Sequence, residues 1–157
     1  VPGMRARGRG RLLATVSMGG IISLPGSAAY SAAKAGLRAF LTALSAELAG
    51  SGVRVAGVYP SGVDTPMLRL EARHGGSLLN FVGRVHSVPD VVAAYEKALT
   101  GRRLEVYLPY TDSITTRLAH SVPGAANRII PLFERFGRRG HAKYLARIDA
   151  EEASADG

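Results

Sequence analysis

Three short apolar runs alternate with helical patterns, and this alternation constrains the fold more than any other feature of the sequence. The runs cover residues 11–17, 53–59 and 104–108, and helical patterns fill about 28–49 and 87–100 between them. Nearly continuous apolar runs of this length are typical of strands buried on both faces of a parallel sheet. Strands that alternate with helices predict right-handed crossovers, and therefore an α/β fold built on a parallel sheet.

The two helical patterns carry their own start and stop signals. Ser27 is a suitable N-cap for the first helix, which the Gly50-Ser51-Gly52 segment ends. The second begins with Ser87-x-x-Asp90, which has the pattern of a capping box. Much of the first helix is alanine, so its surface is smooth enough to pack closely against another helix.

The net charge of +8 comes almost entirely from arginine. The arginines are spread along the chain instead of forming one stripe with aromatic residues, so we expect solvated charges and no nucleic-acid role. The chain has no cysteine, no apolar run long enough to span a membrane, and no apolar signal segment among its basic first residues. These features favour a cytoplasmic protein.

The four histidines, His74, His86, His120 and His141, form no metal-binding pattern. They lack H-x-x-x-H or H-E-x-x-H spacing and have no carboxylate cluster nearby at ligand spacing. We therefore expect no metal site.

Tyr30 and Lys34 stand four residues apart on the predicted first helix, which places both side chains on one face. An ordinary phenol holds its proton too tightly for acid/base catalysis at neutral pH, and an adjacent ammonium favours the phenolate. The pair is thus a candidate proton donor and acceptor. Alone, this spacing is equally typical of a half-exposed tyrosine beside a solvated lysine.

The surroundings of the pair favour the catalytic interpretation. Ser17 ends the first apolar run, 13 residues before Tyr30, and the second run ends in the PSGVDTPM segment at residues 60–67. The carboxyl ends of parallel strands border the crevice in which open α/β sheets bind ligands. Ser17, Tyr30, Lys34 and residues 60–67 are therefore predicted to meet at one edge of the sheet.

The stretch from about Arg9 to Met67 resembles the short-chain dehydrogenase/reductase family. The resemblance lies in a G-x-[LIV]-[LIV] strand ending in serine, a loop with Pro-Gly, Y-S-A-A-K, an alanine-rich helix closing on A-E-L, V-R-V-x-x-V and P-x-G-V-x-T. It extends over residues 1–109, and the remainder matches only loosely. It implies the C-terminal part of a Rossmann-like doubly wound parallel sheet, with a short helical C-terminal extension.

The resemblance also implies an oxidoreductase that transfers hydride between an alcohol and a carbonyl, with NAD or NADP and a small-molecule, apolar substrate. Tyr30 would be the catalytic acid/base, Lys34 would favour its phenolate and bind the cofactor ribose, and Ser17 would hold the substrate oxygen. The implied cofactor-binding residues are Tyr30, Lys34, Pro60, Ser61, Gly62, Val63 and Thr65. The family usually has glycine directly after the proline, where this chain has Ser61.

The family's glycine-rich phosphate turn and the residue that selects NAD or NADP would both precede this segment. We therefore expect an N-terminally truncated half that binds cofactor weakly by itself, because the helix terminus that cradles the pyrophosphate is missing. The alternative is a non-catalytic fragment or subunit-interaction module. In this family the alanine-rich helix at 28–49 would pair subunits, which implies a homo-oligomer.

The chain is expected to divide into three parts. Residues 1–109 form the partial Rossmann-like domain, 110–148 a helical extension and 149–157 a disordered acidic tail. Within the extension, residues 110–124 would be a connecting segment, followed by two short amphipathic helices at 125–136 and 140–148 that are broken at Gly137 and Gly140.

Two segments and one side chain keep alternative interpretations. The leucines and aromatic residue of 66–87 would either wall a substrate site or close over the core. The basic amphipathic segment 123–148 would cover the substrate pocket or dock a second subunit, both favoured over an anionic membrane surface because Pro131 and Gly137 interrupt its apolar stripe. Asp64 is more typical of a turn-forming carboxylate than of a catalytic one.

Overall fold

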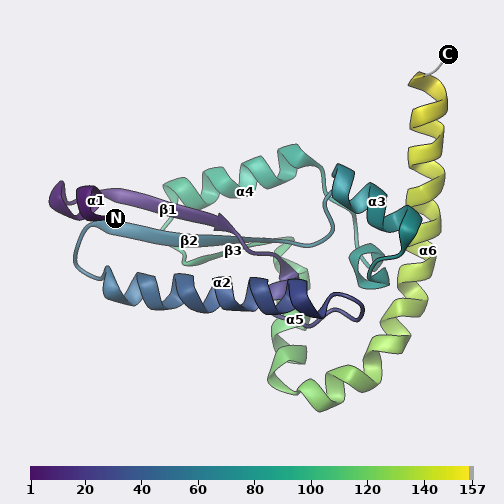
Figure 1. Ribbon diagram of the computed structural model, residues 1–157, viewed down its shortest axis with the longest axis horizontal. Coiled ribbons are helices and arrows are strands. Elements are labelled where there is room, and N and C mark those ends of the chain that lie inside the picture. Colours follow the sequence, from purple (N-terminus) through teal and green to yellow (C-terminus); the bar gives the residue numbers. More distant parts are fainter. Residues whose placement is uncertain (156–157) are drawn as a thin grey trace.

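The computed structural model describes residues 1–155, and it is built on a three-stranded parallel sheet (Figure 1). The strands β1 (Gly10–Thr15), β2 (Val53–Pro60) and β3 (Glu105–Leu108) lie in the order β1-β2-β3. Gly10 is in register with Val53, and Gly57 is in register with Glu105. The predicted α/β fold with a parallel sheet is confirmed.

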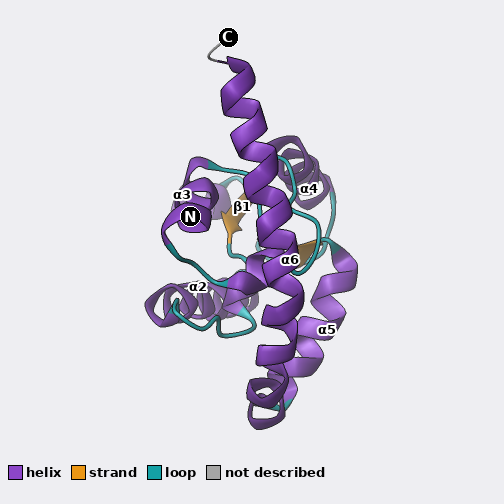
Figure 2. Ribbon diagram, turned by 90° about the vertical axis from the view of Figure 1, so that its right-hand side faces the viewer, coloured by secondary structure: helices purple, strands orange, loops and turns teal. Residues whose placement is uncertain are grey.

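The two crossover helices, α2 (Ala28–Glu47) and α4 (Val88–Thr100), cover opposite faces of this sheet (Figures 1 and 2). The capping box that opens α4 is present: Ser87 Oγ accepts from the Asp90 amide at 3.3 Å, and Asp90 Oδ2 accepts from the Ser87 amide at 2.9 Å. After α2 the chain turns at Gly52, with a φ of 74°. A Cβ there would lie 1.9 Å from the Gly8 carbonyl oxygen, so this turn requires glycine.

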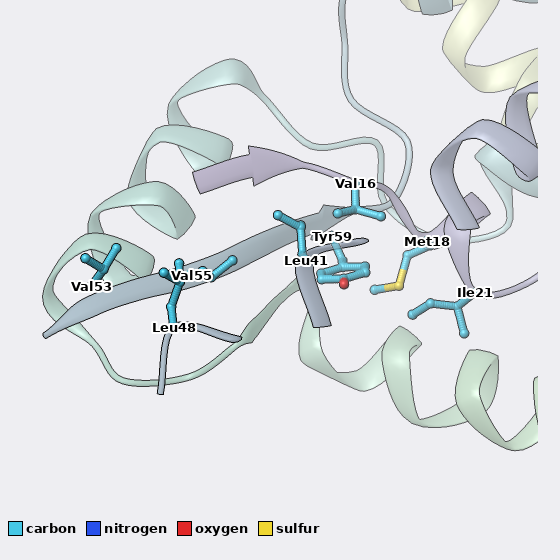
Figure 3. Close-up of a cluster of buried hydrophobic side chains, with 8 residues drawn as sticks. All are labelled: Val16, Met18, Ile21, Leu41, Leu48, Val53, Val55 and Tyr59. Carbon is cyan, nitrogen blue, oxygen red and sulfur yellow. The ribbon is translucent and has the colours of Figure 1, made fainter. Parts of the chain in front are cut away.

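The core follows the alternation of side chains along β2, the central strand. Val53, Val55 and Tyr59 point to the α2 face and pack there with Leu41 and Leu48. Figure 3 shows this cluster together with Val16, Met18 and Ile21, from the end of β1 and the turn after it. Ala56 and Val58 point to the other face and pack against Ala94 and Ala98 of α4.

The remaining helices precede β1 or follow β2 and β3 in the chain. A short helix α1 (Pro2–Ala6) precedes β1, and the 3₁₀ turn η1 (Met18–Gly20) follows it. Helix α3 (Pro66–His74) and the 3₁₀ turn η2 (Leu78–Phe81) follow β2, and α5 (Tyr110–Ser121) and α6 (Pro123–Ala155) follow β3. Helix α6 crosses in front of the carboxyl ends of the strands (Figure 2). No helix within residues 1–155 is long and apolar enough to cross a membrane.

The second half of the chain corrects two expectations. Residues 110–121 form α5 in place of a connecting segment, and a single helix α6 replaces the two expected helices. Gly137 and Gly140 do not break this helix; they let it approach the backbone of η2. A Cβ on Gly137 would lie 2.2 Å from the Leu78 carbonyl oxygen, and a Cβ on Gly140 would lie 1.9 Å from the Phe81 carbonyl oxygen.

The expected disordered tail at 149–157 is corrected for the part that the structure describes. Residues 149–155 continue α6, and 156–157 lie outside the described residues. Arg73 of α3 binds Asp149 and Glu152, each at 2.8 Å, so the acidic residues of the supposed tail have fixed partners. These ion pairs join residues far apart in sequence, and local composition could not indicate them.

Candidate active site

Ser17 lies where β1 ends and the chain turns across the carboxyl edge of the sheet. The β1–β2 ladder continues through Val16, whose amide donates to the Val58 carbonyl at 2.8 Å. At Ser17 the backbone adopts a φ of 115°, the only positive value outside glycine among the described residues. Its Oγ accepts from the Gly19 amide at 3.1 Å and caps η1. Such backbone conformations are rare and costly for a residue with a side chain. The hydrogen bond from the Gly19 amide holds the Ser17 hydroxyl in place at this turn.

Tyr30, in the first turn of α2, lies against the same turn. A Cβ on Gly19 would lie 3.0 Å from Tyr30 Cε1, so the phenol ring packs directly on the backbone that follows Ser17. A Cβ on Gly20 would lie 2.9 Å from the Lys34 carbonyl oxygen. The Gly19-Gly20 pair therefore lets η1 approach both α2 residues of the predicted site.

Lys34 completes this arrangement from the next turn of α2. Its Nζ donates to the Thr15 carbonyl at 3.0 Å and lies 5.6 Å from the centre of the Tyr30 ring. Thr15 is the last residue of β1 and lies two residues before Ser17. The structure thus brings the serine, tyrosine and lysine together at the carboxyl end of β1. We refer to them as the Ser17–Tyr30–Lys34 site.

The loop at residues 60–65 leaves the neighbouring strand at the same edge. The Ser61 amide donates to the Leu108 carbonyl at 2.9 Å, which ties the start of the loop to β3. His86 holds its middle from both sides: the His86 amide donates to the Gly62 carbonyl, and the Asp64 amide donates to the His86 carbonyl, both at 2.8 Å. The path of this loop is therefore set by backbone hydrogen bonds.

Two side-chain features of this loop explain its sequence. A Cβ on Gly62 would lie 2.4 Å from the Asn80 carbonyl oxygen, so the approach of η2 requires the glycine at this position, one residue later than in the family's pattern. Thr65 Oγ1 accepts from the Leu68 amide at 3.3 Å and caps α3. Ser61 Oγ is buried and has no hydrogen-bond partner in the described part of the chain.

Asp64, in this loop, binds side chains from two helices. Arg69 of α3 donates to Oδ1 at 2.9 Å and to Oδ2 at 3.1 Å. From α6, Tyr144 donates to Oδ1 at 2.7 Å and Arg147 donates to Oδ2 at 2.8 Å. These four residues are called the Asp64 cluster below.

The charges within the Asp64 cluster define the role of this carboxylate. Hydrogen bonds from Arg69 hold the pKa of Asp64 well below its usual range against the opposing effect of burial, and those from Arg147 and Tyr144 add to the shift. Burial raises the pKa of Tyr144 to about 12, and its hydrogen bond to Asp64 contributes in the same direction. Asp64 is therefore an ionised anchor for α6, which agrees with a structural and not a proton-transferring role.

Sequence reasoning missed Arg69, Tyr144 and Arg147. Tyr144 and Arg147 stand three residues apart and therefore project from one side of α6. They lie 80 and 83 residues from Asp64. The one available signal was a carboxylate inside a loop that leaves the sheet edge, and it carried no information about which residues would bind it.

A second carboxylate cluster lies on the α2 face of the sheet, centred on Glu105. Arg38 Nε donates to Glu105 at 2.7 Å and Tyr59 donates to it at 3.0 Å, while Tyr107 is a third donor. Burial acts to raise the pKa of Glu105, but the hydrogen bonds from Arg38 and Tyr107 hold it below its usual value. This cluster fixes α2 to β3 and borders a cavity of about 400 Å³, whose lining also includes Arg117.

The segment 66–87, which the sequence assigned either to a substrate wall or to the core, contains both buried and exposed apolar side chains. Leu68 and Phe81 are buried with Tyr144 and Ile148 of α6. Leu70 and Val82 are exposed. The first pair closes over a small core between α3, η2 and α6, and the second pair remains available to a ligand.

No group of three or more potential metal-ligating side chains comes together within residues 1–155.

Comparisons with known proteins agree with this fold. The model of the short chain dehydrogenase family matches residues 1–74. An uncharacterised oxidoreductase of Myxococcus xanthus is 33% identical over 139 residues, which cover 88% of this chain and 50% of that protein. The ketoacyl reductase HetN of a Nostoc species is 31% identical over 118 residues, which cover 73% of this chain and 40% of that protein.

Solved structures give the same result. A short chain dehydrogenase from Burkholderia cenocepacia, in complex with NADP, superposes with a TM-score of 0.65 at 26% identity, over 82% of this chain and 50% of that one. The chain belongs to the short-chain dehydrogenase/reductase family. It spans about half the length, or less, of the relatives named here.

Proposed function

We propose that this chain is the catalytic half of an NAD(P)-dependent oxidoreductase that interconverts an alcohol and a carbonyl compound. The observation that carries the proposal is the Ser17–Tyr30–Lys34 site. The Tyr30 ring packs on the turn that holds Ser17, and the Lys34 ammonium is fixed to the end of the same strand. In this proposal residues 1–109 are the catalytic half and residues 110–148 are a helical extension.

Each side chain of the site has a defined task in the proposed reaction. Tyr30 gives its phenolic proton to the substrate carbonyl oxygen in reduction, or takes one from the alcohol in oxidation. The Ser17 hydroxyl donates a hydrogen bond to the same oxygen and stabilises the charge that develops there. The Lys34 ammonium lies beside the Tyr30 ring, 5.6 Å from its centre, and is held there by the Thr15 carbonyl.

The residues at this edge fit a nicotinamide nucleotide, which supplies the hydride when bound. An ammonium has three donors, and Lys34 directs one to Thr15, so the others can reach the hydroxyls of a ribose. The Thr65 hydroxyl accepts from the Leu68 amide and keeps its own proton for a carboxamide oxygen. The buried Ser61 hydroxyl lacks a partner among the described residues. Pro60, Gly62 and Val63 would contribute the backbone of the same cofactor contact.

The substrate and the assembly are also part of the proposal. Exposed Leu70 and Val82 favour an apolar substrate. Helix α2 exposes most of its alanines together with Phe40, whose exposed fraction is 59%, and this supports subunit pairing through residues 28–49. We propose a cytoplasmic homo-oligomer that uses NAD or NADP.

One observation favours the alternative, a non-catalytic interaction module. Within the described residues, β1 is hydrogen-bonded to a neighbouring strand along one edge only. A free strand edge can pair with another chain. In the enzymatic proposal, further strands of the complete protein occupy this edge.

Replacement of Tyr30 by phenylalanine separates the two functions. In the full-length protein that carries this segment, Tyr30→Phe should lower kcat for reduction of a ketone by about 100-fold or more, because the proton donor is lost. The matched control is Tyr95→Phe, since Tyr95 of α4 binds Thr15 with its hydroxyl but lies outside the site. The control should keep kcat, and circular dichroism should show both variants folded. A Tyr30→Phe enzyme with near-normal turnover would contradict the proposal.

A further inference from the structure

Helix α5, its C-cap and the first part of α6 expose many large apolar side chains to solvent. Their exposed fractions range from 39% to 68%. The residues concerned are Tyr110, Ile114, Leu118, Val122, Ile129, Leu132, Phe133 and Phe136. Extensive exposed apolar surface on a soluble protein indicates an interaction site. We call residues 110–139 the basic–apolar hairpin.

The apolar residues of the hairpin form a stripe on each helix. On α5 they recur every fourth residue from Tyr110 to Val122, and on α6 they occupy 129, 132, 133 and 136. Both spacings place the side chains on one side of the helix concerned. The hairpin also projects beyond the layer formed by α2 (Figure 1). None of these apolar side chains belongs to the buried clusters of the chain.

The charges around these stripes indicate what covers them. The α6 part of the hairpin carries Arg128, Arg135, Arg138 and Arg139 against a single carboxylate, Glu134. None of these four arginines forms an ion pair with a residue that the structure describes. A partner that covers the apolar stripes must therefore also supply negative charge.

A second copy of the chain is a poor source of that charge. The acidic end of α6 is already neutralised, since Asp149, Glu151 and Glu152 bind arginines of α3 and α6. The other carboxylates without an ion pair in the described region are Glu47, Glu71, Glu96, Asp112 and Glu134, each on a different helix. No single helix within residues 1–155 thus offers a row of unpaired carboxylates to the hairpin.

We propose that the basic–apolar hairpin docks the protein on an anionic lipid surface. Its stripes would enter the boundary between headgroups and acyl chains, and its arginines would bind the lipid phosphates. A helix that combines apolar residues with flanking arginines, and that is not apolar enough to span a bilayer, is suited to this position. This inference is independent of the proposed enzymatic reaction.

Vesicle flotation with the purified full-length protein that carries this segment tests the proposal. We expect it to float with vesicles of phosphatidylcholine that contain phosphatidylglycerol, to remain behind with pure phosphatidylcholine, and to be released by high salt. Leu132→Ser together with Phe136→Ser should abolish flotation, because these side chains are exposed and their loss spares the core. Circular dichroism verifies that this variant is folded.

A matched pair of charge variants identifies the hairpin as the binding surface. Arg135→Gln, Arg138→Gln and Arg139→Gln combined should weaken binding by at least about tenfold, since each arginine near an anionic membrane contributes to affinity. The same change at Arg5, Arg7 and Arg9 removes equal charge from the other end of the chain and should leave binding within about twofold. Equal loss in both variants would overturn the proposal. So would a dimer in size-exclusion chromatography that the Leu132 and Phe136 changes dissociate, in a protein that does not float.

Discussion

The two halves of helix α6 have opposite surroundings. From Gly137 onward the helix packs on η2 and α3 and buries Tyr144 and Ile148. Its Arg147 and its acidic residues bind partners in the loop at 60–65 and on α3. Before Gly137 it exposes Leu132 and Phe136 and leaves its arginines without ion pairs to described residues. Both halves carry arginines and large apolar side chains, but only the second has more than a single carboxylate, and its acidic residues pair with α3. An arginine or an apolar side chain of α6 therefore anchors the helix only where the structure opposite supplies a partner.

Two features outside α6 create the anchored half. The backbone of η2 approaches the helix where Gly137 and Gly140 leave room for it. Asp64 supplies a carboxylate that binds Tyr144 and Arg147. The free half has neither an opposing backbone nor a carboxylate of this kind among the described residues. The comparison predicts that equal substitutions in the two halves have unequal effects.

Truncation of an aliphatic side chain should show the largest inequality. Ile148→Ala removes a fully buried side chain and should lower the free energy of unfolding by about 3 kcal/mol, while Leu132→Ala, on the exposed half, should change it by less than about 0.5 kcal/mol. Urea unfolding of the two variants measures the difference. Similar costs for both would mean that the two halves of α6 are equally packed, contrary to the comparison.

Replacement of glycine by alanine should give effects of opposite sign. A Cβ on Gly140 meets the Phe81 backbone, so Gly140→Ala forces η2 and α6 apart and should cost about 2 kcal/mol. Gly124, in the free half, has open space within 4 Å of the position that a Cβ would take. Gly124→Ala should therefore stabilise the protein by up to about 1 kcal/mol through helix propensity. Thermal unfolding distinguishes the two, and stabilisation by both substitutions would refute the close approach.

Local signals predicted the sheet and the Ser17–Tyr30–Lys34 arrangement. The predicted strand at 53–59 and the observed β2 (Val53–Pro60) agree to within one residue. A continuous apolar run is a local feature of the sequence, and it is typical of a strand buried in a parallel sheet. Tyr30 and Lys34 lie together because helical spacing requires it. Their proximity to Ser17 follows from the rule that parallel strands end at one edge.

Contacts between distant segments were not predictable in the same way. Gly137 and Gly140 have the local pattern of helix breakers, and only the path of η2 shows that they permit contact instead. The acidic residues from Asp149 onward have the composition of a solvated tail, and Arg73, 76 residues earlier in the chain, gives the first of them its partner. In both cases the deciding residue lies outside any sequence window around the feature.

Asp64→Asn tests the electrostatic part of the anchor and should cost less than the loss of the buried Ile148 side chain. The amide keeps the size of the side chain but loses the charge that binds Arg69 and Arg147, whose side chains are partly solvated, so we expect a loss of about 1–2 kcal/mol at neutral pH. Amide hydrogen exchange should accelerate in α6 beyond residue 140 and remain unchanged before 136. Glu134→Gln, a matched change in the free half, should affect neither region.

The pH dependence of the stability lost in Asp64→Asn separates the contribution of the carboxylate charge from that of packing. Because the pKa of Asp64 is lower in the folded chain than its usual value, its charge stabilises the fold above about pH 4, and this contribution is lost as the pH falls toward the lowered pKa. Asp64→Asn has no such contribution to lose. Its unfolding free energy should therefore approach that of the unmodified chain in acid, with the gap fully open at neutral pH. A gap that stays constant from neutral to acidic pH would show that packing, and not the carboxylate charge, holds α6 to the loop.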